Sequence, residues 1–272
     1  MKTTQRLLVV IAAALALLSS TACSKLQARD HLNKGVQAYK NSKFEDAIGH
    51  FQKAVALDPS LINARLYLAT AYAQQYIPGA DTPDNNHFAE QAIDSYKEVL
   101  QVDPRNVNSI KGIAYLYLQM KKFPLAKEYY KKASDVDPND PEPYYSVAVI
   151  DWTQTYVPRQ EERAKLGMKP DDSLPAKDKK VCATMRETNT GNVQEGIDNL
   201  NKALKLRPDY DDAMAYMNLM YRERADIECD DPAARSADLK TADEWVDKTM
   251  ATKKAKAEKQ PGAGGIVMDQ KQ

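Results

Sequence analysis

The sequence predicts an all-α fold, and three observations support this prediction. First, the 272 residues include only ten glycines and four phenylalanines, whereas Ala, Leu and Lys, which favour helices, are abundant. Second, small and aromatic residues recur with the same spacing in two separate stretches of the chain. Third, four stretches of similar sequence end in a proline, which cannot continue a helix interior. These prolines are Pro59, Pro104, Pro138 and Pro208.

The repeated unit is clearest in two stretches that begin at Ala28 and at Val107. In the first stretch the recurring residues are Gly35, Tyr39, Phe44, Ala47, Phe51, Ala54 and Pro59. In the second they are Ile113, Ala114, Tyr117, Phe123, Ala126, Tyr130, Ala133 and Pro138. This pattern resembles the tetratricopeptide repeat (TPR), a helical hairpin of about 34 residues. The resemblance implies a right-handed superhelical solenoid, in which stacked hairpins bury a continuous core.

Five hairpins are expected, and three of them are interrupted. Their ranges are 28–61, 62–106, 107–140, 141–210 and 211–255. The second, fourth and fifth hairpins carry long insertions between their first and second helices. In the second, the insertion reads as a loop with Pro78, Gly79, Pro83 and two adjacent asparagines, which are turn residues. All three insertions should emerge at one edge of the solenoid, either as tolerated loops or as a partner-binding edge.

The N-terminus carries the features of an export signal over residues 1–22. Lys2 and Arg6 precede an apolar run at residues 7–18, which is shorter than the roughly 20 residues needed to span a bilayer. Cys23 follows small residues and resembles the acylated cysteine of bacterial lipoproteins, although Ser20 stands where that family prefers Leu. The resemblance implies a lipid anchor on Cys23, a short linker at 23–27, and an outer-membrane location facing the periplasm. Cleavage without acylation, giving a soluble periplasmic or secreted protein, is the alternative.

Two further cysteines, Cys182 and Cys229, fall in the insertions of the fourth and fifth hairpins. An exported protein meets an oxidising environment, so we expect them to form a disulfide; two unpaired thiols are the alternative. The glycine-containing tail at residues 260–272 is expected to be disordered.

The resemblance also implies a concave peptide groove lined by the first helix of each hairpin. In this chain the groove positions are apolar or aromatic. They are Leu32, Val36, Tyr39, Leu66, Tyr115, Leu118, Tyr145, Val149, Trp152 and Leu219. Family members that hold acidic C-terminal peptides use Lys, Asn and Arg in a clamp, and of the matching positions here only Asn108 is polar. We therefore expect a ligand segment with apolar anchors, unless the chain's own loops fill the groove.

Catalytic, cofactor and metal sites are not expected. His31, His50 and His87 lack metal-ligand spacing, and phosphate-binding or nucleophile motifs are missing. The net charge of zero does not favour nucleic acid. The sequence thus predicts a non-enzymatic scaffold or adaptor of the bacterial cell envelope with an unidentified protein partner. The alternatives are a self-associating structural protein and a regulatory subunit of an envelope hydrolase.

Overall fold

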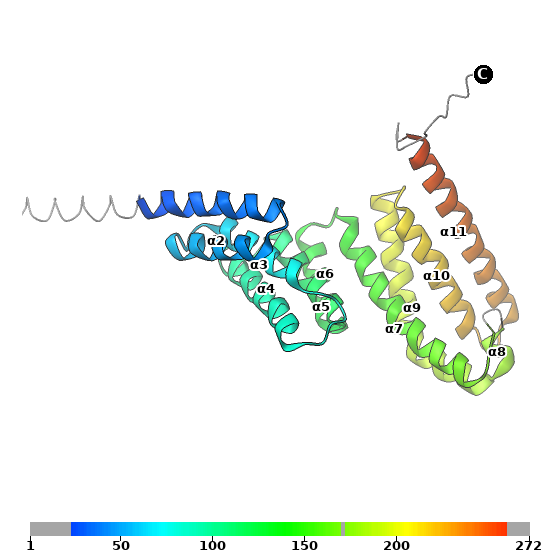
Figure 1. Cartoon of the computed structure of the whole chain (residues 1–272). Helices are drawn as coiled ribbons and strands as arrows, with labels where there is room; N and C mark the ends of the chain where they lie inside the picture. Colours follow the sequence, from blue (N-terminus) through cyan, green and yellow to red (C-terminus); the bar gives the residue numbers. More distant parts are fainter. Residues whose placement is uncertain (1–22, 170–171, 260–272) are drawn as a thin grey trace, which may run out of the picture. The chain divides into compact units, whose positions relative to one another are not determined.

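The computed structural model describes residues 23–169 and 172–259, and its regular secondary structure over these residues is entirely helical (Figure 1). The predicted all-α fold is confirmed. The expected export signal at 1–22 and the expected disordered tail at 260–272 lie outside the described residues. The chain divides into two compact units, Met1–Val136 (unit 1) and Asp137–Gln272 (unit 2).

Unit 1 is a series of helical hairpins joined by short turns. Residues 23–40 are helical and precede five helices. These are α2 (Phe44–Leu57), α3 (Ile62–Gln75), α4 (Pro83–Val102), α5 (Val107–Gln119) and α6 (Phe123–Val136). Each helix packs on the next along the chain. The small residues that carry the repeat pattern, such as Ala47, Ala114 and Ala126, are fully buried, because they lie where two helices approach closely.

Local capping explains where two helices of unit 1 begin. The Thr82 side chain accepts a hydrogen bond from the Asn85 N–H, and Pro83 occupies the first turn of α4. At α5, the Asn106 side chain accepts from the Ser109 N–H at 3.0 Å. Such caps satisfy N–H groups that have no partner within the helix.

Unit 2 is also built from paired helices, and most of them are longer than those of unit 1. They are α7 (Pro141–Lys165), α8 (Leu174–Lys177), α9 (Lys179–Leu206), α10 (Asp211–Ile227) and α11 (Pro232–Lys259). The main pairs are α7 with α9 and α10 with α11, and α9 also packs on α10. Their common core is made of aliphatic and sulfur-containing residues, including Val193, Leu200 and Met217.

The insertions are mostly extra helix, so the expectation of a long loop was wrong at several positions. In unit 1, Pro83, Asn85 and Asn86 lie inside α4, and only residues 76–82 separate it from α3. Asn85 is buried and holds this turn: it accepts from the Ile77 N–H at 2.7 Å and donates to the Ile77 and Ala80 carbonyl oxygens. One asparagine side chain thereby provides hydrogen-bond partners for backbone groups of Ile77 and Ala80 in this turn.

In unit 2 the insertions lengthen the paired helices. α7 has 25 residues and α9 has 28, compared with 13 in α5 and 14 in α6. Only residues 228–231 separate α10 from α11. Among the helices of the described residues, none is long and apolar enough to cross a bilayer.

Candidate functional site

The predicted groove residues of unit 1 lie at or near its surface. Five of them, Leu32, Val36, Tyr39, Leu66 and Leu118, are half-buried. The sixth, Tyr115, is 50% exposed. The unpredicted Tyr67 is also exposed and stacks on the buried Phe51 with ring centroids 5.6 Å apart. Unit 1 therefore presents scattered aromatic side chains.

The predicted groove residues of unit 2 gather into one aromatic cluster. Tyr145 contacts Tyr210 and Tyr216, with ring centroids 5.0 and 5.5 Å away. Trp152 stacks on Tyr156 at 4.5 Å and meets Tyr216 edge-on at 5.5 Å. We call these five residues the aromatic cluster. The other two predicted positions, Val149 and Leu219, are half-buried on the same two helices, α7 and α10.

The hydroxyls of Tyr145, Tyr210 and Tyr216 in the aromatic cluster stay neutral at physiological pH. Burial raises the pKa of Tyr210 to about 12, and it also raises the pKa values of Tyr145 and Tyr216. The cluster can therefore offer neutral hydrogen bonds beside its apolar ring surface. Tyr156 was not predicted as a site residue because it falls in the expected insertion of the fourth hairpin; its spacing of four from Trp152 was the available signal.

A buried ionic network continues along α7 beyond the aromatic cluster. Arg159 forms ion pairs with Glu223 at 2.9 Å and with Asp226 at 2.6 Å, both from α10. Arg163 reaches the same Asp226 carboxylate at 3.4 Å. Burial raises the pKa of the Glu223 carboxyl to about 7, and the Asp226 charge acts in the same direction, against the opposing effect of Arg159.

This network forms one wall of a pocket of about 530 Å³ within unit 2, which we call the arginine pocket. Its walls come from α7, α10, α11 and the segment after α7. The lining residues are Tyr156, Arg159, Gln160, Arg163, Met168, Asp172, Arg222, Asp226, Arg235 and Leu239. Four arginines against two aspartates favour an anion over a cation.

Cys182 and Cys229 form a disulfide in the structure, with an S–S distance of 1.98 Å and a Cα–Cα distance of 5.7 Å. It ties the start of α9 to the turn between α10 and α11. Both cysteines are buried. The two insertions that carry them are thus linked covalently.

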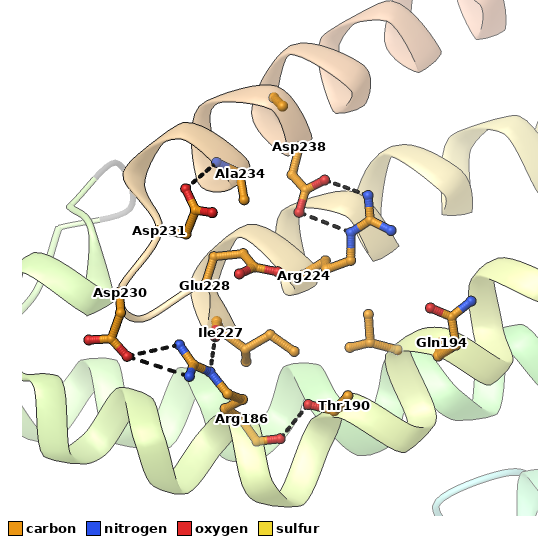
Figure 2. Close-up of a pocket in the computed structure, with 12 residues that line it drawn as sticks. Arg186, Thr190, Gln194, Arg224, Ile227, Glu228, Asp230, Asp231, Ala234 and Asp238 are labelled. Atoms are coloured by element: carbon orange, nitrogen blue, oxygen red, sulfur yellow. Dashed lines mark hydrogen bonds and ion pairs between the residues drawn. The ribbon is translucent and has the colours of Figure 1, made fainter.

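A second pocket, of about 730 Å³, is lined by residues of α9, α10, α11 and the turn between α10 and α11 (Figure 2). Arg186 donates to the Ile227 carbonyl oxygen at 2.9 Å and pairs with Asp230. Arg224 and Asp238 form two parallel hydrogen bonds of 2.9 and 2.5 Å, as the dashed lines in Figure 2 show. Both arginines of this pocket are already paired. We therefore interpret it as a contact that joins α9, α10 and α11 rather than as a binding site.

Cys23 and His31, both in the N-terminal helical segment, are relevant to the expected lipid anchor and to metal binding. Cys23 is exposed and is not part of a disulfide. His31 and His50 lie side by side, with their Nδ1 atoms 3.1 Å apart, a proximity that the sequence alone did not reveal. Across residues 23–169 and 172–259, no group of three or more metal-ligating side chains is found.

Comparison with known proteins gives two matches to the tetratricopeptide repeat, at residues 32–77 and 89–150. No curated protein is significantly similar to this chain. Among solved structures, a crystal structure of MamA has 12% identity and a TM-score of 0.57, covering 88% of this chain and 98% of its own. MamA 41-end from Desulfovibrio magneticus RS-1 has 15% identity and a TM-score of 0.55, covering 84% and 96%. YrrB, a TPR protein with an unusual peptide-binding site, has 14% identity and a TM-score of 0.50, covering 84% and 90%. At such low sequence identities, the similarity to these structures shows a shared fold and nothing more.

Proposed function

We propose that this chain, which belongs to the tetratricopeptide-repeat family and has the fold of a protein-interaction scaffold, is a non-enzymatic adaptor of the bacterial cell envelope. It binds a protein partner through the aromatic cluster of unit 2 and is held at a membrane through an acylated Cys23. TPR proteins generally act as scaffolds rather than catalysts.

The observation that carries the binding proposal is the aromatic cluster itself. Its five rings come from α7, α10 and the residue before α10, and they contact one another directly. The rings of Tyr145, Trp152, Tyr156 and Tyr216 are only partly buried, so part of each ring is open to a ligand. Large aromatic side chains in partly desolvated positions provide much of the binding energy in protein interfaces. YrrB, which shares the fold, has a peptide-binding site.

The proposed anchor rests on Cys23 and on the sequence before it. Cys23 follows a cationic start and a short apolar run, and its thiol is exposed at the edge of the described residues. A single acyl chain binds membranes weakly, so stable anchoring requires more than one chain. We therefore propose a multiply acylated N-terminus at Cys23 that faces the periplasm from the outer membrane.

Crosslinking in the native envelope tests the binding proposal. We expect Trp152→Ala to reduce recovery of the crosslinked partner at least about tenfold, because it removes a central aromatic residue of the cluster. Trp245→Ala is the matched control, since Trp245 is also half-buried in unit 2 but lies on α11 outside the cluster. Tyr156→Ala provides a second variant if Trp152→Ala misfolds. Unchanged recovery in both cluster variants would refute the aromatic cluster as the binding site.

The same experiment separates the alternative functions. Recovery of the chain only with itself would favour a self-associating structural protein. Recovery of an envelope hydrolase whose activity changes when this chain is removed would favour a regulatory subunit.

Mass spectrometry of the mature protein tests the anchor. We expect an N-terminal Cys23 with the added mass of acyl chains, and release of the Cys23→Ser variant from the membrane fraction. An unmodified N-terminus at Ser24 would contradict the anchor and leave the binding proposal intact.

A further inference from the structure

We propose that the arginine pocket binds a single carboxylate of an extended protein segment, whose neighbouring aromatic or apolar side chains lie against the aromatic cluster. This inference rests on the proposed adaptor function and specifies the chemistry of the partner. The pocket shares no position with the acidic-peptide clamp of the family, whose matching residues here are Leu32, Val36, Tyr67, Asn108 and Gly112.

The charges around the pocket leave one arginine without a counter-ion. Glu223 and Asp226 accompany Arg159 and Arg163. Arg222 is paired with Asp243 at 2.7 Å.

Arg235, on the first turn of α11, has no carboxylate partner among the described residues, and its Nε is buried without a hydrogen-bond acceptor. A buried guanidinium N–H without an acceptor is costly. A ligand carboxylate in the pocket would place a negative charge beside this guanidinium.

The pocket also contains neutral donors suited to a carboxylate. Gln160 and Tyr156 line it beside Arg235. Arginine presents a planar fork of donors that matches the two oxygens of a carboxylate. Because only the Arg235 guanidinium lacks a paired carboxylate and Asp172 adds a negative charge to the lining, a monoanion fits the pocket better than a phosphate dianion.

The aromatic cluster and the arginine pocket are continuous along α7. Tyr145, Trp152, Tyr156 and Arg163 follow one another at intervals of seven, four and seven residues, which places them along one stripe of the helix. Tyr156 belongs to both sites, since it stacks on Trp152 and lines the pocket. A segment lying on the rings would therefore deliver its carboxylate to the pocket.

The remaining acidic residue in the pocket lining is Asp172, and its negative charge weakens the binding of an anion. Its carboxylate accepts a hydrogen bond from the Lys169 N–H at 2.7 Å and has no recorded ion pair in the described part of the chain. An anion in the pocket would be repelled by it. Asp172→Asn keeps an acceptor for that N–H and removes the charge, so it should strengthen binding.

The walls of the pocket are held in place before a ligand arrives. Arg163 donates to the Asp172 and Lys169 carbonyl oxygens, which ties these two residues to α7. The disulfide ties α9 to the turn that leads into α11. Such preorganisation reduces the entropy cost of binding.

The test uses the full mature chain and three N-acetylated six-residue peptides with the same two aromatic residues. One ends in a free carboxylate, the second is its C-terminal amide, and the third is an amide that carries one glutamate. Binding is followed by tryptophan fluorescence and by the NMR signals of the arginine Nε–H groups. We expect the two acidic peptides to bind at least about tenfold more tightly than the neutral amide, as for hydrogen bonds to charged groups. The tighter of the two acidic peptides identifies a C-terminal or a side-chain carboxylate as the source.

Three variants make the test specific to the pocket. Arg235→Gln should weaken the acidic peptides about tenfold or more and leave the neutral amide unchanged. Arg186→Gln is the matched control, because Arg186 is partly exposed in unit 2 but belongs to the other pocket; it should change nothing. Asp172→Asn should strengthen the acidic peptides a few-fold.

Equal binding of acidic and neutral peptides would overturn the inference, as would equal effects of Arg235→Gln and Arg186→Gln. Tighter binding of inorganic phosphate than of the acidic peptides would overturn the choice of a carboxylate. If Trp152→Ala abolishes crosslinking in the envelope while Arg235→Gln leaves both crosslinking and peptide binding unchanged, the adaptor proposal stands and this inference fails. If acidic peptides bind through Arg235 but no partner is crosslinked, the pocket is supported and the adaptor proposal fails.

Discussion

Units 1 and 2 are built from the same helical hairpin, yet their interiors differ in polarity. Among the described residues, the buried polar side chains of unit 1 are Asn85 and Ser109, and both are uncharged. Unit 2 buries five charged residues. They are Asp151, Arg163, Glu223, Asp226 and Asp238. The difference coincides with the long helices of unit 2.

This contrast shows what happens when the helices of a repeat are extended. Within the normal hairpin length, small and aromatic residues fill the space between helices. Beyond that length, the extra turns of α7 and α10 meet through Arg159, Glu223 and Asp226 instead of through apolar side chains. Buried charges are costly unless paired, so the extension of unit 2 depends on these ion pairs, whereas the described part of unit 1 buries no charged residue.

The largest expected effect comes from removing the shared acid of unit 2. Asp226→Ala leaves Arg159 and Arg163 without the carboxylate that both contact. Breaking a buried ion pair in this way costs about 3–5 kcal/mol of unfolding free energy. Thermal unfolding followed by tryptophan fluorescence measures the loss in unit 2 alone, because both tryptophans, Trp152 and Trp245, lie in that unit.

Asp243→Ala is the control for this prediction. Asp243 also pairs with an arginine, Arg222, but its side chain is 70% exposed. We expect a loss below about 1 kcal/mol, as for surface ion pairs. Equal losses in the two variants would mean that burial of the network does not determine the stability of unit 2.

The fold could be predicted from sequence because it depends on a few spaced positions. The alanines at Ala47, Ala54, Ala126 and Ala133 follow from the repeat pattern, and all four are fully buried. Their spacing reflects helix geometry, which any single sequence displays. The interrupted hairpins were harder, because Pro83 and the two asparagines that follow it also occur at helix starts.

The candidate site was predicted only in part. Tyr145 and Trp152 stood at expected groove positions, whereas Tyr156, Tyr216 and Arg235 did not. The arginine pocket brings residues 156–172 of one insertion together with residues 222–239. No local pattern encodes such long-range proximity, and the helical continuation of α7 past Pro158 was not expected.

A smaller effect distinguishes the apolar packing of the two units. Gly35→Ala in unit 1 would place a Cβ 2.5 Å from the rigid ring of Phe51. We expect a cost of about 1–3 kcal/mol, typical of overpacking. Gly196→Ala in unit 2 would place its Cβ 2.4 Å from the end of the Met220 side chain. Methionine is flexible, so the cost should be smaller than for Gly35→Ala.

Hydrogen exchange of α2 and α9 measures the loss of unfolding free energy caused by Gly35→Ala separately from the loss caused by Gly196→Ala. The matched controls are Gly49→Ala in α2 and Gly191→Ala in α9, where an added Cβ has no neighbour within 4 Å. Both should stabilise their helix by about 0.5–1 kcal/mol through helix propensity. A larger loss for Gly196→Ala than for Gly35→Ala would refute the idea that unit 1 has the more rigid apolar packing.

A further expected effect is a pH dependence confined to unit 2. Burial raises the pKa of Glu223 from 4.5 to about 7. Between these two pH values the folded state binds more protons than the unfolded state, so the unfolding free energy should fall as pH rises. The slope cannot exceed about 1.4 kcal/mol per pH unit for one proton. Below about pH 4.5 and above about pH 7, Glu223 should contribute no slope.

Glu223→Gln tests this assignment through tryptophan fluorescence measured between pH 5 and pH 7. The charged groups that face Glu223 are Arg159 and Arg163 on α7 and Asp226 on α10. Gln cannot titrate, so the variant should lose the decline that the wild-type chain shows in this range. If the decline persists in Glu223→Gln, another group is responsible, and the assignment of the pH dependence to Glu223 is wrong.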